Sequence, residues 1–344
     1  MSPSAHFGRL LAVALFCYST AAGNEAQAAE KSTKSAVKIR ISQSAVGARS
    51  TILWSAQELG LFAKHGIDAE VVYLRSSPIQ MTALSTGEVQ FAASGGSPVL
   101  GAAAAGQDIK IVASPSNRLS YDLVVRPEIK EAKDLRGKRF GITSIGGTVW
   151  MAAYLALEHL GLDANRDQIR INAIGNQTIL AQAVESAQID ATLLDPFLSR
   201  QTKAKGLPVL IELQRAQIPF TNTAWAVSGS FLRERADAVE AVLKAMFEAQ
   251  AFITAPANRN AVLQIMARHM KLNDAVLLQD GYQDLLVGLE RKPYAALDGL
   301  RNIQRIMSTI NANASRAKVE EIIDNRIVRK LDESGFINGL YAKR

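Results

Sequence analysis

The stretch VKIRISQSAVGARSTILWSAQELGLFAKHGIDAEVVY, residues 37–73, decides the fold class of this chain. Its β-branched start, residues 37–41, predicts a strand. Residues 51–65 carry apolar side chains at helical spacing and stop at Gly66, which predicts a helix. Residues 67–73 predict a second strand. A strand, a helix and a strand in this order form the repeating unit of a largely parallel sheet flanked by helices.

The same alternation continues down the chain and then restarts in its middle. A faint internal echo accompanies the restart, because ALSTGEVQ at residues 83–90 matches AVESAQID at residues 183–190. We therefore expect an α/β protein with two similar lobes, followed by helices from Leu232 onward. The further predicted strands are 89–93, 109–113, 139–142, 169–174, 191–194 and 225–227, and the further predicted helices are 78–86, 149–160, 178–186 and those that follow Pro98 and Pro196.

The first 28 residues predict a signal peptide. Arg9 precedes the apolar stretch 10–22, and Ala26-Gln27-Ala28 fits a small-x-small cleavage pattern. An ordinary buried N-terminal helix is the alternative. After cleavage near Ala28, residues 29–36 predict a flexible lead-in. Cys17, the only cysteine, would leave with the signal peptide, so the mature protein would have no thiol.

Composition and charge argue against several classes of protein. Hydrophobic residues make up 48% and charged residues 21% of the chain, as in an ordinary globular protein. The net charge of +7 is spread along the sequence, without the basic stripe that nucleic-acid binding needs. The four histidines stand apart and no nucleophile elbow is present, so we expect no metal, no cofactor and no catalytic residue.

The loops between strands and helices predict the binding residues. In open α/β sheets a ligand binds beyond the carboxyl ends of the strands, and these loops here are rich in Ser, Thr, Gly and Asn. Each candidate has a competing interpretation without a ligand. The loops could only cap helices, Arg49 could be a solvated surface residue, and the tryptophans could only pack in the core. The candidates chosen from these loops, from the helix starts beside them and, for Trp225, from a presumed chain crossing are Arg49, Trp54, Ser94, Ser97, Ser144, Gly146, Gly147, Thr148, Trp150, Asn176, Asp195 and Trp225.

Three of these features carry specific chemistry. The pair Gly146-Gly147 would let the backbone at the next helix start approach an anion or a carbonyl oxygen. The Arg49 guanidinium could pair with a carboxylate or a sulfonate. Ser97-Pro98 and Asp195-Pro196 would each cap a helix that begins with proline.

The order of these motifs resembles one known family. LWSAQELGLF at residues 53–62 with Gly66-Ile67-Asp68 is similar to the opening helix of the sulfonate, nitrate, taurine and thiamine-precursor binding proteins. The similarity runs from about Val37 to Trp225. It continues through ALSTGEV at 83–89, SGGSP at 94–98, DLRGKR at 134–139, SIGGT at 144–148, IDA at 189–191 and DP at 195–196.

The resemblance implies the two-lobed type II periplasmic-binding-protein fold with a helical C-terminal region. Lobe one would hold residues 37–118 with part of 222–344, and lobe two residues 119–221. The crossings between them would lie near 116–121 and 219–225. Residues 222–344 would return to lobe one and form the C-terminal helices. By position, the resemblance carries ligand contacts over to Ser44, Arg49, Ser97, Asn117, Thr148, Asp195 and Trp225.

The resemblance also implies a function. We expect a monomeric periplasmic protein that binds a sulfonate, carboxylate or pyrimidine-like solute and delivers it to the membrane permease of an ABC importer. An enzyme on the same fold, such as the similar pyrimidine synthases, is the first alternative, although those enzymes carry a cysteine-rich segment and lack an export signal. The second alternative is a solute sensor that presents its ligand to a membrane receptor.

Overall fold

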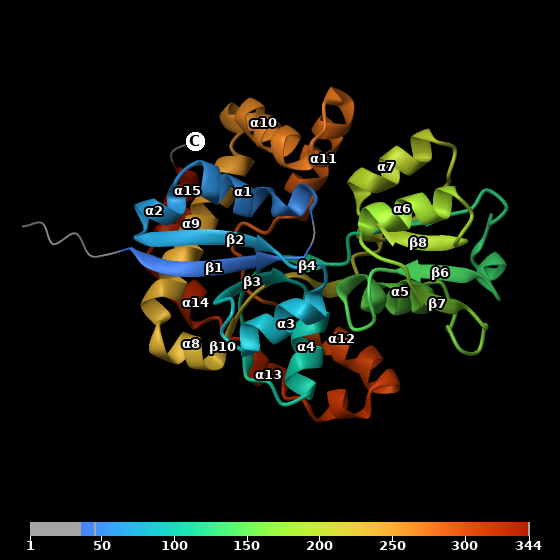
Figure 1. Ribbon diagram of the computed structural model, residues 1–344, viewed down its shortest axis with the longest axis horizontal. Coiled ribbons are helices and arrows are strands. Elements are labelled where there is room, and N and C mark those ends of the chain that lie inside the picture. The colour runs from blue at the N-terminus through green and yellow to red at the C-terminus, as the bar shows by residue number, and fades with distance from the viewer. Residues whose placement is uncertain (1–35, 45, 343–344) are drawn as a thin grey trace, which may run out of the picture. The chain divides into compact units, whose positions relative to one another are not determined.

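Two five-stranded mixed sheets carry the fold (Figure 1). The computed structural model describes residues 36–44 and 46–342, which fall in one compact unit that begins at Ala36. The predicted signal peptide, its cleavage site and Cys17 lie outside the described residues. No described helix is both long and apolar enough to cross a lipid bilayer.

The first sheet has the strand order β2-β1-β3-β10-β4. Both β2 and β3 pair with β1 in parallel, whereas β10 runs antiparallel to β3 and β4. The prediction of a largely parallel sheet therefore holds except for this one strand. The bounds are β1 Val37–Gln43, β2 Ile67–Tyr73, β3 Phe91–Ser94, β4 Ile109–Arg118 and β10 Pro219–Ser228.

The second sheet repeats this arrangement with the order β7-β6-β8-β5-β9. Here β6 pairs with β7 and β8 in parallel, and β5 is the strand that runs antiparallel to its neighbours β8 and β9. Neither β5 nor β9 was expected from the sequence. The bounds are β5 Asp122–Val125, β6 Arg139–Ile142, β7 Arg170–Ala173, β8 Ala191–Leu194 and β9 Val209–Glu212.

We call each sheet, with the helices that pack on it, the first and the second lobe. The helices of the second lobe are α5 Thr148–His159, α6 Gln177–Glu185 and α7 Pro196–Ala204. Those of the first lobe are α1 Thr51–Glu58, α2 Leu61–Lys64, α3 Ser77–Ser85, α4 Gly96–Ala104, α8 Gly229–Glu234, α9 Ala236–Thr254, α10 Arg259–Met270, α11 Ala275–Gly288, α12 Leu297–Ile310, α13 Val319–Ile322, α14 Arg326–Glu333 and α15 Phe336–Ala342.

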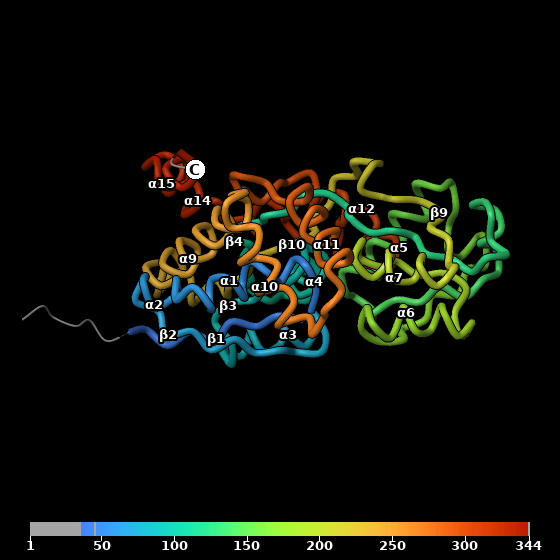
Figure 2. Tube along the Cα trace, turned by 90° about the horizontal axis from the view of Figure 1, so that it is seen from above, coloured from blue at the N-terminus to red at the C-terminus, as the bar shows by residue number. Residues whose placement is uncertain are grey.

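The helix expected at residues 51–65 is interrupted. Gly60 adopts a left-handed conformation with φ of 65°, so α1 ends at Glu58 and α2 begins at Leu61. The long helix α9 packs along both pieces, although it lies far away in the sequence (Figure 2). The C-terminal half of the chain therefore holds the opening helix in place.

The chain passes from one sheet to the other twice. Residues 119–121 connect β4 to β5, and residues 213–218 connect β9 to β10. The second passage lies before the expected region 219–225, which belongs to β10. The first passage is shorter than the expected region 116–121, because β4 continues to Arg118. The predicted lobe bounds stay a prediction.

The internal echo has a structural counterpart. In each lobe the residue at the end of the repeat, Gln90 or Asp190, accepts a hydrogen bond through its side chain from the backbone N–H of an arginine. These bonds measure 2.9 Å from Arg40 to Gln90 and 2.8 Å from Arg139 to Asp190. The two lobes thus join a helix to a buried strand by the same local device.

Candidate ligand-binding site

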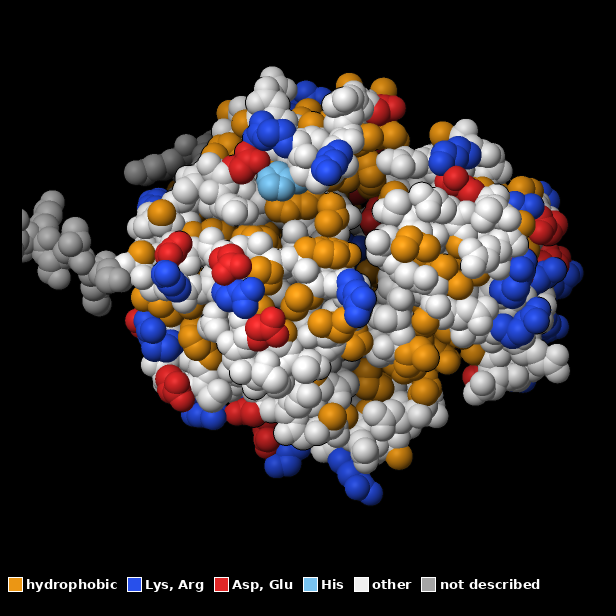
Figure 3. All heavy atoms as spheres, in the orientation of Figure 1, with side chains coloured by type: hydrophobic (Ala, Val, Ile, Leu, Met, Phe, Trp, Pro, Cys, Tyr) orange, Lys and Arg blue, Asp and Glu red, His pale blue; other side chains and the backbone are white. Residues whose placement is uncertain are grey.

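A cavity of about 470 Å³ lies between the two lobes. Figure 3 shows its surroundings as a furrow between the two groups of elements. The lining comes from the carboxyl ends of β1, β3, β6 and β8, from both chain crossings, and from α9 and α11. This position follows the rule for open α/β sheets.

Eight of the expected binding residues line the cavity. They come from both lobes and from the returning strand β10. They are Ser44, Arg49, Ser94, Ser144, Thr148, Asn176, Asp195 and Trp225.

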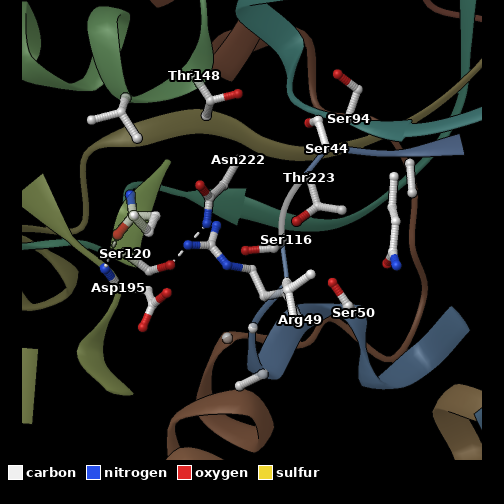
Figure 4. Close-up of a pocket in the computed structure, with 18 of the residues that line it drawn as sticks. Ser44, Arg49, Ser50, Ser94, Ser116, Ser120, Thr148, Asp195, Asn222 and Thr223 are labelled. Atoms are coloured by element: carbon white, nitrogen blue, oxygen red, sulfur yellow. Dashed lines mark hydrogen bonds between the residues drawn. The ribbon is translucent and has the colours of Figure 1, made fainter. Parts of the chain in front are cut away.

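Among the residues that the structure describes, Arg49 is one of two arginines that line the cavity, and Arg75 is the other. Arg49 follows β1 in a short 3₁₀ turn, Ala48–Ser50, and its guanidinium carbon lies 4.9 Å from the centre of the Tyr121 ring. Within residues 36–44 and 46–342, Arg49 makes no side-chain hydrogen bond or ion pair. Figure 4 shows the side chain reaching toward Asn222 and Ser120. Its donors are therefore available to an anionic group.

Asp195 supplies a carboxyl group from the second lobe. Its Oδ1 accepts the N–H of Leu198 at 2.9 Å, which caps α7 as the sequence predicted. Burial raises the pKa of this carboxyl, while the Leu198 N–H and the charge of Arg49 oppose that rise. The second oxygen points toward Gly47 of the first lobe, where an added Cβ would lie 3.4 Å from it.

Helix starts and hydroxyl groups surround the same space. The helices α3, α4 and α5 begin beside the cavity. Ser76, the N-cap of α3, makes no capping hydrogen bond through its side chain, and the N-caps of α4 and α5 are Gly95 and Gly147, which have no side chain to cap with. Backbone N–H groups at uncapped helix starts attract anions. Among the described residues, Ser94 Oγ and Asn222 Oδ1 are buried without a hydrogen-bond partner. The cavity therefore offers both donors and acceptors to a solute.

The glycine pair acts differently from the prediction. Gly146 has a φ of 76°, and a Cβ on Gly147 would lie 2.7 Å from Ser144 Oγ and 3.1 Å from Ser144 O. Both glycines are needed for the tight turn 144–147 and lie outside the cavity lining. Thr148, the first residue of α5, is the residue of this motif that lines the cavity.

The lobes touch at the same point. An added Cβ on Gly95 of the first lobe would collide with Thr148 Oγ1 of the second. Gly95 has an ordinary φ of −118°, so close approach of the lobes, rather than backbone strain, requires glycine here.

Trp54 belongs to the core of the first lobe, as does Trp150 to that of the second. Trp54 is 2% exposed and stacks on His269 of α10 with ring centres 4.7 Å apart. Trp150 is 7% exposed and meets Tyr154 edge-on. Both tryptophans therefore pack in the core, which was the alternative to ligand contact.

Ser97 and Asn117 also lie outside the lining. Ser97 is fully buried in the first turn of α4, whose N-cap is Gly95, so the predicted cap at Ser97 was wrong. Asn117 ties β4 to the segment before α12. Its Nδ2 donates to Tyr294 O at 2.9 Å, and its Oδ1 accepts the N–H of Ala296 at 3.2 Å.

Several lining residues were missed by the sequence reasoning. Tyr121 supports Arg49, Asn222 donates to Ser120 Oγ at 2.8 Å, and Gln177 accepts the N–H of Asp195 at 3.0 Å. Tyr121 lies within the predicted crossing 116–121, and Gln177 lies in the loop between the predicted strand 169–174 and the predicted helix 178–186, so both could have been found there. The lining residues of α9 and α11 had no such signal, and they are Met246, Asp284, Leu285 and Gly288.

Over the described part of the chain, no group of three or more His, Cys, Asp or Glu side chains is arranged to hold a metal ion.

Two similar sheets joined by two crossings, with a cavity between them, define the periplasmic-binding-protein class of fold. A protein of Bordetella bronchiseptica RB50 superposes with a TM-score of 0.74 at 18% identity, covering 87% of this chain and 98% of that one. The alkanesulfonate-binding protein SsuA of Xanthomonas axonopodis pv. citri, bound to MOPS, gives 0.71 at 17% identity over 84% and 98%. The nitrate-binding protein NrtA of Synechocystis PCC 6803 gives 0.69 at 14% over 89% and 91%.

The chain belongs to the NMT1/THI5-like family, whose model matches residues 48–258. A binding protein of Brucella abortus strain 2308 is 30% identical over 227 residues, which are 64% of this chain and 68% of that protein. An aliphatic sulfonates-binding protein of Bacillus subtilis strain 168 is 27% identical over 187 residues, or 53% and 55% of the two chains.

Proposed function

We propose that this protein binds a small organic anion in the cavity between its lobes and delivers it to the membrane permease of an ABC importer. The observation that carries the proposal is Arg49, a cavity-lining guanidinium that makes no ion pair with another described residue. Relatives and structural neighbours named as sulfonate- and nitrate-binding proteins support it. In this role the protein is exported, monomeric and without catalytic activity.

The cavity favours an organic solute over a bare inorganic ion. Pockets of about 300–1,000 Å³ are typical of drug-sized ligands, and this cavity has about 470 Å³. Apolar side chains of Leu285, Leu289 and Phe197 line it together with the polar groups around Arg49. A sulfonate or carboxylate attached to an apolar body satisfies both kinds of surface.

A thermal-shift screen tests the proposal. The probes are MOPS, which is bound to the Xanthomonas neighbour, biphenyl-2-sulfinate, which is bound to another neighbour, a short alkanecarboxylate, and nitrate. Binding to the folded state raises the melting temperature, so we expect organic anions to raise it in the parent and much less in Arg49→Ala. Equal shifts in both proteins would refute a site built on Arg49.

Two further measurements separate the alternatives. Mass spectrometry of a bound solute after long incubation should recover it unchanged, whereas a product would favour the enzyme. N-terminal sequencing of the exported protein should begin near Ala29, whereas an intact Met1 would contradict cleavage at Ala28.

A further inference from the structure

Arg200 joins the two lobes across the edge of the cavity. It lies on α7 of the second lobe and forms a two-pronged ion pair with Asp284 on α11 of the first lobe. The two contacts measure 3.0 Å from Nη1 to Oδ2 and 2.6 Å from Nη2 to Oδ1. A third contact runs from Nε to Asp280, at 3.4 Å. Beside them, Phe197 of α7 packs against Gly281 of α11.

Carboxyl groups from both lobes surround this guanidinium. Burial raises the pKa of Asp284 to about 6, which the charge of Arg200 opposes and the charges of Asp122 and Asp280 reinforce. Burial also raises the pKa of Asp122 on β5, again against the effect of Arg200. Arg200 is thus the cation that keeps acidic groups of two lobes in one place.

Two further acids face this group from neighbouring elements. Glu212 at the end of β9 and Asp195 at the start of α7 both act on the pKa of Asp122 and raise it. Glu212 pairs with Arg215, and the charge of Arg49 acts on Asp195. Without Arg200, the repulsion between the lobes would therefore come mainly from Asp122 facing Asp284. Like charges at short range in a poorly solvated place repel strongly.

We propose that Arg200 is a clamp residue, which holds the lobes closed over the cavity by pairing carboxyl groups from both of them. The clamp sits next to the binding site, because Asp284 also lines the cavity. Its effect on solute affinity rests on the proposed function, since a cleft that is closed for a smaller fraction of the time binds proportionally more weakly. Its effect on closure itself does not.

A second ion pair between the lobes differs in burial. Arg305 of α12 contacts Glu158 of α5 through two contacts of 2.8 Å. Their side chains are 54% and 49% exposed, whereas those of Arg200 and Asp284 are 36% and 17% exposed. Exposed pairs contribute little because water screens them and both side chains lose freedom. The less exposed pair at Arg200 should therefore contribute more to closure than the pair at Arg305.

Small-angle scattering without added solute tests the clamp. We expect Arg200→Gln to have a larger radius of gyration than the parent at pH 7.5. The matched control is Arg301→Gln, which removes an arginine–carboxylate pair with Glu320 inside the first lobe and should leave the radius unchanged.

Acid should reverse the opening. In the variant, Asp284 lacks the Arg200 charge that lowers its pKa. As the pH falls, Asp284 in the closed form therefore takes up a proton, and its repulsion with the neighbouring carboxylates is lost. At pH 5 the radius of Arg200→Gln should return to that of the parent. The double variant Arg200→Gln/Asp284→Asn, in which the facing charge is absent, should already be compact at pH 7.5.

Three results would overturn the clamp. They are equal radii of Arg200→Gln and the parent at pH 7.5, an expansion that persists at pH 5, and an expanded double variant. If circular dichroism shows that Arg200→Gln is unfolded at pH 7.5, the double variant must be folded and compact, and otherwise the proposal fails. Because no solute is present, these outcomes are independent of the thermal-shift screen.

Discussion

Replacing Arg49 by alanine should cost solute affinity without costing stability. The guanidinium makes no hydrogen bond or ion pair within the described residues, and its one described ring contact is with Tyr121, at 4.9 Å. A cation over an aromatic ring contributes about 0.5–1 kcal/mol at an exposed site. Partial burial of the unpaired charge destabilises the folded state, whereas the contact with the Tyr121 ring stabilises it. The two effects nearly offset each other in the free energy of unfolding.

The loss in binding should be much larger. A hydrogen bond to a charged group contributes about 1.5–3 kcal/mol, and about 1.4 kcal/mol corresponds to a factor of ten in affinity. Arg49→Ala should therefore weaken binding of an organic anion by about tenfold to a hundredfold. Tyr121→Leu, which keeps the cation and removes its support, should weaken binding by only about twofold to fivefold.

Titration calorimetry with a solute from the thermal-shift screen gives these affinities, and denaturation followed by circular dichroism checks the folding. Arg301→Ala is the control, because its side chain is 55% exposed and pairs with Glu320 away from the cavity lining. An unchanged dissociation constant in Arg49→Ala would refute the reasoning. If Thr148→Val weakens binding while Arg49→Ala does not, the solute is neutral and is held by the second lobe.

Three other predictions use different parts of the structure. Gly95→Ala should fold normally but increase the radius of gyration, because its Cβ collides with Thr148, and Thr148→Ala in the same chain should reverse the increase; a parent-like radius in the single variant would mean that the lobes do not touch there. Trp54→Ala should lower the free energy of unfolding by about 3–5 kcal/mol in urea titrations while the solute affinity stays unchanged, and a weaker affinity would place this side chain at the cavity. The folded-state pKa of Asp284, about 6, lies above its ordinary value, so the folded protein binds a proton that the unfolded chain has lost. Stability should therefore rise as pH falls from 7.5 to 5, and the rise should be smaller in Asp284→Asn; identical slopes in urea titrations would contradict the assignment.

Much of the fold could be predicted because most of its strands are marked by local runs of β-branched and apolar residues. The predicted bounds of β2, β6 and β8 coincide with the observed ones, and the loops that follow most of the predicted strands border the cavity. The strands β5 and β9 were missed, although with four residues each they are as long as the predicted strands β6 and β8. Their pairing depends on where the chain crosses between the lobes, and no local pattern encodes that.

The site was harder to predict than the fold. Trp54 and Arg49 lie five residues apart at the same end of the first strand–helix unit. Which of them faces the cavity depends on α10, which covers Trp54 from more than two hundred residues away. The lining residue Asp284 lies on a helix that follows no strand, so the rule about carboxyl ends could not find it.

The position of β10 has a consequence for how the protein is made. The second sheet comes entirely from residues 122–212, so all its strands are available as soon as that stretch has emerged. Among the described strands of the first sheet, β4 pairs only with β10, which is inserted between β4 and β3. Until residues 219–228 arrive, β3 and β4 both present unpaired edges, which are sites of mispairing and aggregation. A chain interrupted before Pro219 would thus have a complete second sheet and an incomplete first sheet. The unpaired edges of β3 and β4 are the places where we expect chaperones to bind such a chain.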